Sequence, residues 1–163
     1  HDRTEALSLS DKIILMHRGK IASIGSPMEL LEQPPNSYSG KFLAGMSSLD
    51  VIILSKNNDI MTVELSGGTL TCKSTIDSNK GDKIKLLIMG SHVILHNSSR
   101  EGSNIFKCKV ANVTNTGSFI EYNFALDDNT IKITRDSLEE FSISKGDSIY
   151  LEIPSHACRL VKE

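Results

Sequence analysis

One eight-residue pattern occurs twice in the sequence, and it decides how the larger part of the chain folds. Residues 81–88 are GDKIKLLI and residues 146–153 are GDSIYLEI. In both copies a Gly-Asp pair precedes a strand whose Ile, Leu and Ile fall on one face, because side chains alternate between the two faces of a strand. Alternating runs at 69–72 and 130–133 stand upstream of the two copies. The region contains either two related β halves or one barrel whose meander repeats a favoured turn.

Short β-rich segments continue on both sides of this pattern, from Met46 to the end of the chain. Polar turns separate segments of roughly 6 to 10 residues, the first at 57–59 and the last at 145–147. This rhythm is typical of a small barrel or sandwich. We therefore predict a mainly β fold, α+β when the whole chain is counted, with an OB-like β-barrel domain over residues 46–163.

The first 45 residues have a different texture. A capping-box pattern at 2–5 predicts a short helix. The apolar runs 12–17 and 20–25, with a glycine turn between them, predict a hairpin. A Ser-Pro start at 26–27 predicts a further helix, since proline is favoured at the first helical position. Residues 1–45 therefore form a helix–hairpin–helix unit that precedes the β domain.

The composition excludes several classes of function. The formal net charge is −2, from 18 Lys and Arg against 20 Asp and Glu, and aromatic residues make up 5% with no Trp. Nucleic-acid binding relies on clustered uncompensated cations and on aromatic stacking, so we predict no nucleic-acid partner. The longest apolar runs, at 13–16 and 51–54, are far shorter than the roughly 20 residues that cross a bilayer.

The three cysteines and the first residue indicate the setting of the chain. Cys72, Cys108 and Cys158 lie far apart and form no C-x-x-C pair, so neither a disulfide framework nor a zinc knuckle is indicated. A reducing, cytoplasmic location is expected. The chain starts at His1 with no cationic segment followed by an apolar stretch, which is unlike a signal peptide, and we expect further sequence upstream.

The residues of the first 45 positions, taken in order, resemble the final segment of the ATPase subunits of bacterial ABC importers. The resemblance rests on an ordered set at matching spacings: His1-Asp2, Glu5-Ala6, Ser10-Asp11-Lys12-Ile13, Met16, Gly19-Lys20-Ile21, Gly25-Ser26-Pro27, Glu29-Leu30, Pro34 or Pro35, Asn36, Phe42 and Gly45. It is greatest for the importers of sugars, polyamines, iron and inorganic anions, whose ATPases carry a C-terminal extension of the transport-associated OB-fold (TOBE) type. Residues 46–163 are similar to that extension in length and β rhythm.

The resemblance implies that the chain is the C-terminal regulatory and dimerisation region of such a subunit. His1 stands at the position of the switch histidine, which contacts the ATP γ-phosphate, and an imidazole is suited to that contact. The alternative is an exposed terminal histidine whose partners lie in the missing upstream chain. The intact subunit is expected to use ATP and Mg²⁺, to pair with a second copy and with transmembrane permease subunits, and to work at the inner face of the cell membrane. A small-molecule or protein regulator is a further expected partner.

The motifs that bind and cleave ATP are absent from this sequence. It has no G-x-x-x-x-G-K-[ST] phosphate loop, no apolar strand ending in Asp-Glu and no Leu-Ser-Gly-Gly-Gln signature, and residues 65–69 (LSGGT) are interpreted as a hairpin turn. Without the phosphate loop the β- and γ-phosphates have no cradle, so we predict that this chain alone holds no cofactor and does not hydrolyse ATP. Residues 88–92 also depart from the Val/Ile-Arg-Pro-Glu stretch of the family, so no regulatory ligand site is carried over there.

We predict no metal site. His92 and His96 flank a strand-like run and would lie about 13 Å apart at strand rise. His156 and Cys158 share a face, but no second pair completes a tetrahedral set. Residues 127–129 lack the spaced oxygen ligands of a calcium loop and are interpreted as a turn. A second hypothesis for residues 46–163 is a module that binds a small oxyanion or metabolite.

Overall fold

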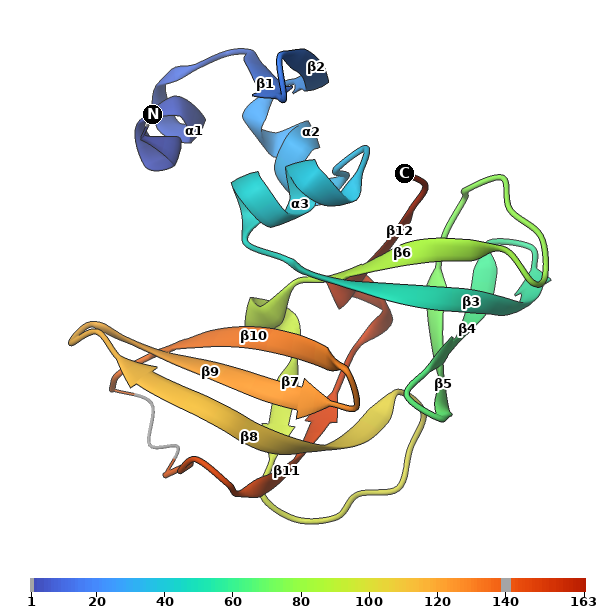
Figure 1. The fold of residues 1–163 in the computed structure, drawn as a ribbon, viewed down its shortest axis with the longest axis vertical. Coiled ribbons are helices and arrows are strands. Elements are labelled where there is room, and N and C mark those ends of the chain that lie inside the picture. The colour runs from blue at the N-terminus through green and yellow to red at the C-terminus, as the bar shows by residue number, and fades with distance from the viewer. Residues whose placement is uncertain (1, 139–141) are drawn as a thin grey trace.

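The computed structural model describes residues 2–138 and 142–163, so His1 lies outside the described residues (Figure 1). The chain begins with helix α1 (Arg3–Leu9), the hairpin β1 (Ile13–His17) and β2 (Lys20–Gly25), and the helices α2 (Pro27–Glu32) and α3 (Ser37–Ala44). We call these elements the N-terminal segment. No helix among the described residues is both long and apolar enough to cross a membrane.

Side-chain caps start the helices of the N-terminal segment. The Asp2 carboxylate accepts hydrogen bonds from the backbone N–H groups of Thr4 and Glu5, at 2.8 and 3.1 Å. The reciprocal capping box is complete at α2, where Ser26 and Glu29 bond each other's backbone N–H. The bonds that Ser26 donates from its backbone and its hydroxyl hold the pKa of the Glu29 carboxyl below its ordinary value. These polar starts explain why such short helices form where the sequence predicts them.

The rest of the chain forms two antiparallel five-stranded sheets. The strands, with two 3₁₀ turns, are β3 (Ser47–Asn57), β4 (Ile60–Leu65), β5 (Gly68–Lys73), β6 (Lys83–Ile88), η1 (Gly90–His92), β7 (Ile94–His96), β8 (Ile105–Asn115), β9 (Phe119–Leu126), β10 (Asn129–Asp136), β11 (Ser148–Glu152), η2 (Ser155–Ala157) and β12 (Cys158–Val161). The strand orders are β12-β6-β3-β4-β5 and β10-β9-β8-β11-β7. We call residues 47–96 the first half and residues 105–161 the second half.

The two halves exchange their last strands. Strand β7 follows β6 in the chain but pairs with β11, where Ile94 lies opposite Glu152. Strand β12 follows β11 but pairs with β6, where Cys158 lies opposite Ile88. Each sheet is therefore four strands of one half completed by one strand of the other. Of the two interpretations of the repeated pattern, this topology confirms two related β halves.

The repeated Gly-Asp pair makes the same turn in both halves. Gly81 donates to the Ile53 carbonyl and Gly146 to the Val110 carbonyl, each at 2.8 Å. The φ angles of the two glycines are +93° and +97°, a region that favours glycine. Directly after each accepting residue the strand register shifts, as in a β-bulge. The shift follows Ile53 in the β3–β4 pair and Val110 in the β8–β9 pair. The Gly-Asp turn therefore fastens the start of β6 to β3 in the first sheet and the start of β11 to β8 in the second.

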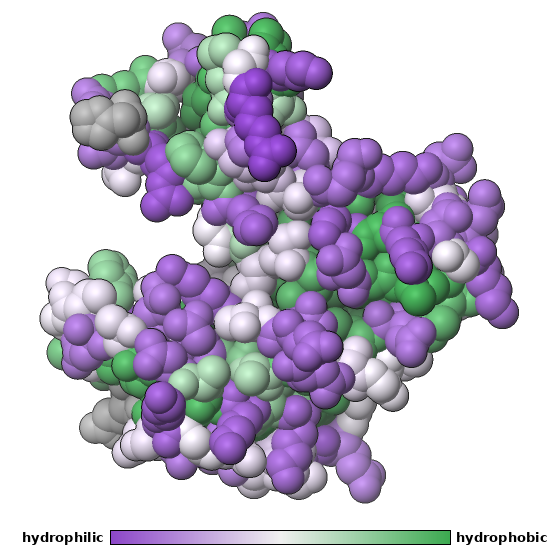
Figure 2. Space-filling view, in the orientation of Figure 1, coloured by the Kyte–Doolittle hydropathy of each residue, from purple (hydrophilic) through white to green (hydrophobic). Residues whose placement is uncertain are grey.

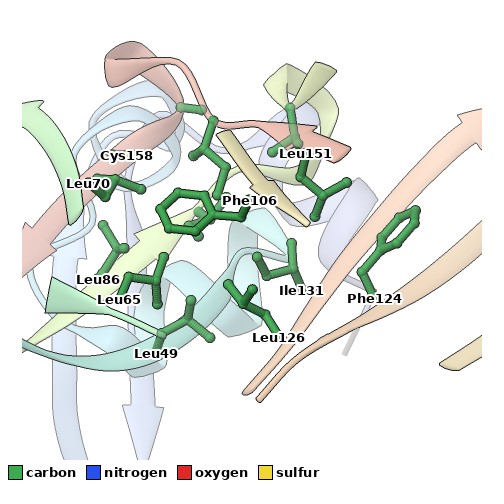
Figure 3. Close-up of a cluster of buried hydrophobic side chains, with 14 of the residues drawn as sticks. Leu49, Leu65, Leu70, Leu86, Phe106, Phe124, Leu126, Ile131, Leu151 and Cys158 are labelled. Carbon is green, nitrogen blue, oxygen red and sulfur yellow. The ribbon is translucent and has the colours of Figure 1, made fainter. Parts of the chain in front are cut away.

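A shared core fills the space between the two sheets. The Ile, Leu and Ile of both copies of the pattern are buried in one cluster, at 84, 86 and 88 and at 149, 151 and 153. In Figure 3 Phe106 of β8 lies among Leu65, Leu70 and Leu86 of the other sheet. The first sheet also curls, because β5 and β12 lie at its opposite ends and yet contact each other. The prediction of a mainly β, OB-like fold is confirmed.

The N-terminal segment has its own small core and rests on the first sheet (Figure 1). Its core contains Ile13, Leu15, Leu30 and Leu43, separate from the cluster between the sheets. The contact between the two parts is close, since a Cβ added to Gly40 of α3 would stand 2.7 Å from a methyl carbon of Leu87 in β6. Helix α3 therefore seats this segment on the β region.

Candidate functional site

The point at which the halves exchange strands gathers the polar chemistry of the β region. Turn η1 links β6 to β7 and turn η2 links β11 to β12. The two turns lie side by side, and the Met89 N–H donates to the Ala157 carbonyl at 2.9 Å. We call residues 89–93 and 154–158 the exchange point.

On the side of η1, a guanidinium closes the second sheet. Arg135 of β10 donates from one terminal nitrogen to the Gly90 carbonyl, at 3.2 Å, and from the other to the Val93 carbonyl. Gly90 itself packs against the backbone of β10, because a Cβ at this position would stand 2.2 Å from the Lys132 carbonyl oxygen. Only glycine permits this approach.

On the side of η2, neutral groups close the first sheet. The backbone N–H of Lys73 in β5 donates to the Ser155 hydroxyl at 2.9 Å. The thiols of Cys72 in β5 and Cys158 in β12 are both buried. The interaction with the Cys72 side chain, together with burial, raises the pKa of the Cys158 thiol. Burial, with a smaller effect of Asp127, also raises the pKa of Cys108 to about 12. Because the thiolate is the nucleophile, neither Cys108 nor Cys158 is suited to catalysis.

A polar side chain at the start of each half reaches the third strand of the other half. The Ser47 hydroxyl accepts from the Lys132 N–H at 2.8 Å. Asn104 does more, since its amide accepts from the Thr71 N–H at 2.8 Å and donates to the carbonyls of Thr71 and Ile153. Its φ angle of +61° is one that Asn tolerates better than most residues. These two residues hold the halves in register with each other.

The histidines are arranged differently from the sequence prediction. His96 bonds the Glu152 carboxylate at 2.8 Å and the Arg100 guanidinium at 3.1 Å. His92 lies instead beside His156, with 5.2 Å between the ring centroids. Sequence reasoning missed this pair, although a signal was present: both copies of the Gly-Asp pattern are followed within a few residues by Ser-His.

The remaining motifs that we singled out from the sequence lie in turns. Residues 65–69 include the turn between β4 and β5, and residues 127–128 form the turn between β9 and β10, both as predicted. Cys158 donates to the Pro154 carbonyl and does not join His156 in a ligand set. Within residues 2–138 and 142–163, no three His, Cys, Asp or Glu side chains gather closely enough to hold a metal ion. The position predicted for the switch histidine, His1, lies outside the described residues.

A groove runs between the N-terminal segment and the first sheet. Its volume is about 730 Å³, and its lining includes Glu32, Lys73 and Arg159. The Arg159 guanidinium donates from Nε to the Glu32 carbonyl at 2.5 Å and from a terminal nitrogen to the carbonyls of His156 and Cys158. Arg159 thus joins helix α2 directly to the exchange point.

The N-terminal segment exposes an apolar surface. Figure 2 shows apolar residues gathered at the end of the molecule that this segment occupies. Besides Phe42 of α3, which is 41% exposed, the large side chains that it exposes are Leu9, Ile14, Met16, Ile21, Ile24 and Met28, of which Leu9 is 77% and Met28 is 68% exposed. Ile14 and Met16 alternate along β1 with the buried Ile13 and Leu15, so both faces of this strand are apolar. We call these six exposed residues the apolar surface.

Comparisons with known proteins place relatives along nearly the whole chain. The maltose/maltodextrin import ATP-binding protein of Vibrio vulnificus is 27% identical over 98% of this chain and 43% of its own length. The spermidine/putrescine import ATP-binding protein of Oleidesulfovibrio alaskensis is 32% identical over 59% of this chain and 26% of its own length. The chain thus spans less than half the length of these curated relatives. No protein-family profile matches it.

One solved structure shares the fold of the β region. The cytoplasmic molybdate-binding protein ModG superposes with a TM-score of 0.60 at 14% sequence identity. The superposition covers 71% of this chain and 95% of that protein. At this identity the likeness concerns the fold alone.

Proposed function

We propose that this chain, which belongs to the family of ATP-binding subunits of bacterial ABC importers, supplies the end of the ATP-binding domain and the regulatory β region of such a subunit. The relatives confirm the resemblance that the first 45 residues predict. In this proposal the N-terminal segment completes the ATP-binding domain, and the two β halves form the regulatory extension. The intact subunit couples ATP hydrolysis to solute uptake.

The observation that carries this proposal is the apolar surface of the N-terminal segment. Burial of a large apolar side chain contributes about 1.5–3 kcal/mol, so a two-strand hairpin with apolar residues on both faces calls for a covering layer. The buried face of β1 packs on α2 and α3, while the face that carries Ile14 and Met16 is uncovered. We assign this face to contact with the preceding part of the ATP-binding domain.

The catalytic chemistry belongs to the intact subunit in this proposal. There His1 contacts the γ-phosphate of ATP, and Mg²⁺ and the phosphate loop are supplied by upstream sequence. The chain alone has no phosphate loop and is expected to be inactive.

The intact subunit is proposed to work with transmembrane permease subunits at the inner face of the cell membrane. We further propose that the β region pairs with a second copy of itself. Phe119 and Ile94 support this, because they are 52% and 46% exposed and line one cavity of about 490 Å³ at the second sheet. A regulator, whether a small molecule or a protein, would act through this region.

A chimaeric subunit tests the proposal. This chain replaces the corresponding C-terminal part of the Vibrio vulnificus relative, and ATP hydrolysis and maltodextrin uptake are measured in membranes with the permease subunits. We expect both activities to be retained. His1→Ala in the chimaera is expected to abolish hydrolysis, whereas the matched change His17→Ala, at an imidazole that packs against Tyr38, is expected to leave hydrolysis intact. Equal activity of the two variants would exclude the role assigned to His1.

Sedimentation of the chain tests whether the β region pairs with a second copy of itself. Phe119→Ser is expected to lower the fraction of dimer, while Leu9→Ser, on the apolar surface, is expected to leave it unchanged. A chain that sediments as a monomer at high concentration would count against pairing through the β region.

A second candidate function is binding of a small oxyanion. The specific observation in its favour is the superposition on 95% of a molybdate-binding protein. Titration calorimetry with molybdate and sulfate tests it. Saturable heat with one of these ions would support the module, and absence of heat up to millimolar concentrations would exclude it without affecting the role in an importer.

A further inference from the structure

We propose that His92 and His156 together bind one divalent transition-metal ion at the exchange point, with zinc as the best match. The two imidazoles come from different halves, His92 from η1 and His156 from η2. Their ring centroids are 5.2 Å apart and their planes are inclined by 50°. Both side chains are exposed, so an ion reaches them directly from solvent.

The separation of the rings matches a tetrahedral ion. A zinc–nitrogen bond of about 2.0–2.1 Å along each ring axis, with a tetrahedral angle between the two bonds, puts the ring centroids about 5 Å apart. A right angle between the bonds would require a shorter separation. Two waters would complete the four ligands, as one does at open zinc sites with three protein ligands.

The two imidazoles are available, unlike the other described histidines. Within residues 2–138 and 142–163, no hydrogen bond to the ring nitrogens of His92 or His156 is found, whereas His96 is bonded to Glu152 and Arg100. His17 packs against Tyr38, with 3.9 Å between the ring centroids and 33° between the ring planes. Unengaged imidazoles bind transition metals readily because the neutral ring is a good ligand.

The backbone that carries the pair is already held in place. The His92 N–H donates to the Met89 carbonyl at 3.0 Å, and the Arg159 guanidinium donates to the His156 carbonyl at 2.8 Å. The ion therefore meets two imidazoles whose backbone is already held in place, and its binding orders their side chains. Because it would tie η1 to η2, bound metal would stabilise the exchanged arrangement of the halves.

The test is calorimetric titration of the full chain with ZnCl₂ in a reducing buffer. His1→Ala is present throughout, because a terminal histidine with its free amine is itself a metal ligand. We expect one Zn²⁺ per chain and a melting temperature that rises with zinc concentration. His92→Ala and His156→Ala are each expected to weaken binding by more than about tenfold, since removal of outer-shell partners alone costs 10–100-fold. His96→Ala is the matched control and is expected to bind normally.

A second readout separates joint from independent binding. With ¹⁵N-labelled protein, the imidazole resonances of His92 and His156 are expected to shift together on zinc addition, while those of His17 stay in place. Binding that survives both single variants would overturn the proposal. So would one Zn²⁺ per two chains with metal-dependent dimerisation, because the ion would then lie between copies. Failure of zinc binding leaves the importer role untouched, since the chimaera tests that role separately.

Discussion

The first and second halves of the β region follow the same chain path but are closed by different chemistry. In the second sheet a charged guanidinium, Arg135, donates to the carbonyls of Gly90 in η1 and of Val93 directly after it, and Gly90 packs against β10. In the first sheet a hydroxyl, Ser155, accepts one backbone hydrogen bond, and the thiols of Cys72 and Cys158 are buried. The comparison teaches that a shared topology does not require shared contacts. It also predicts unequal responses to matched substitutions in the two halves.

The largest effect is expected at Gly90. Gly90→Ala places a methyl carbon 2.2 Å from the Lys132 carbonyl oxygen, a backbone atom that cannot rotate away. We expect the free energy of unfolding to fall by about 3 kcal/mol, at the upper end of ordinary overpacking. Urea unfolding measures it. Gly102→Ala is the control, because there the nearest atom, at 3.0 Å, belongs to the flexible side chain of Ile105. Equal losses in the two variants would show that η1 and β10 are not in close contact.

The next effect compares the two closures. Arg135→Met leaves the carbonyls of Gly90 and Val93 without their charged donor, and hydrogen bonds to charged groups contribute about 1.5–3 kcal/mol. Ser155→Ala removes one neutral acceptor and is expected to cost about 1 kcal/mol. Arg100→Met controls for loss of an arginine at an exposed position. If Ser155→Ala were the more costly change, the first sheet would be the more tightly closed of the two.

A third comparison concerns the residues that hold the halves in register. Asn104→Ala removes three side-chain hydrogen bonds and puts Ala at a φ of +61°, whereas Ser47→Ala removes one bond. We expect losses of about 2 and about 1 kcal/mol in the free energy of unfolding. Asn104→Gly separates the two causes, since Gly accepts the positive φ but makes no side-chain bond. A Gly variant as stable as the wild type would assign the whole role of Asn104 to its backbone.

The sequence predicts the parts of this fold that depend on local pattern. The buried faces of β6 and β11 follow from alternation. The two turns follow from the Gly-Asp pairs, because glycine adopts the positive φ found at Gly81 and Gly146. Strand exchange could not be predicted, because pairing β12 with β6 is a long-range choice that alternation leaves open. For the same reason the sequence analysis weighed His92 only against His96, four residues away, and rejected that pair. The ring that His92 meets is His156, which only the exchange brings near.

The smallest effect concerns a cysteine that has no counterpart in the first half. Cys108 lies opposite Ile149 in the second sheet, as Val51 lies opposite Ile84 in the first. Cys108→Val therefore gives the second half the residue that the first half has at the equivalent position. Because the two side chains are similar in volume, the free energy of unfolding is expected to fall by less than about 1.5 kcal/mol near neutral pH.

The pH dependence of stability distinguishes Cys108 in the wild type from valine in the variant. Burial raises the pKa of the Cys108 thiol from 9.0 to about 12, so the unfolded chain loses this proton at lower pH than the folded protein. The contribution of the neutral thiol to stability is complete below pH 9 and is lost as the pH rises toward 12. Between neutral pH and about pH 10 the stability of the wild type should therefore fall relative to the Val variant by about 1 kcal/mol. Urea unfolding at the two pH values measures this difference. Parallel pH profiles for the two proteins would mean that water reaches the thiol and that the core of the second half is less closed than that of the first.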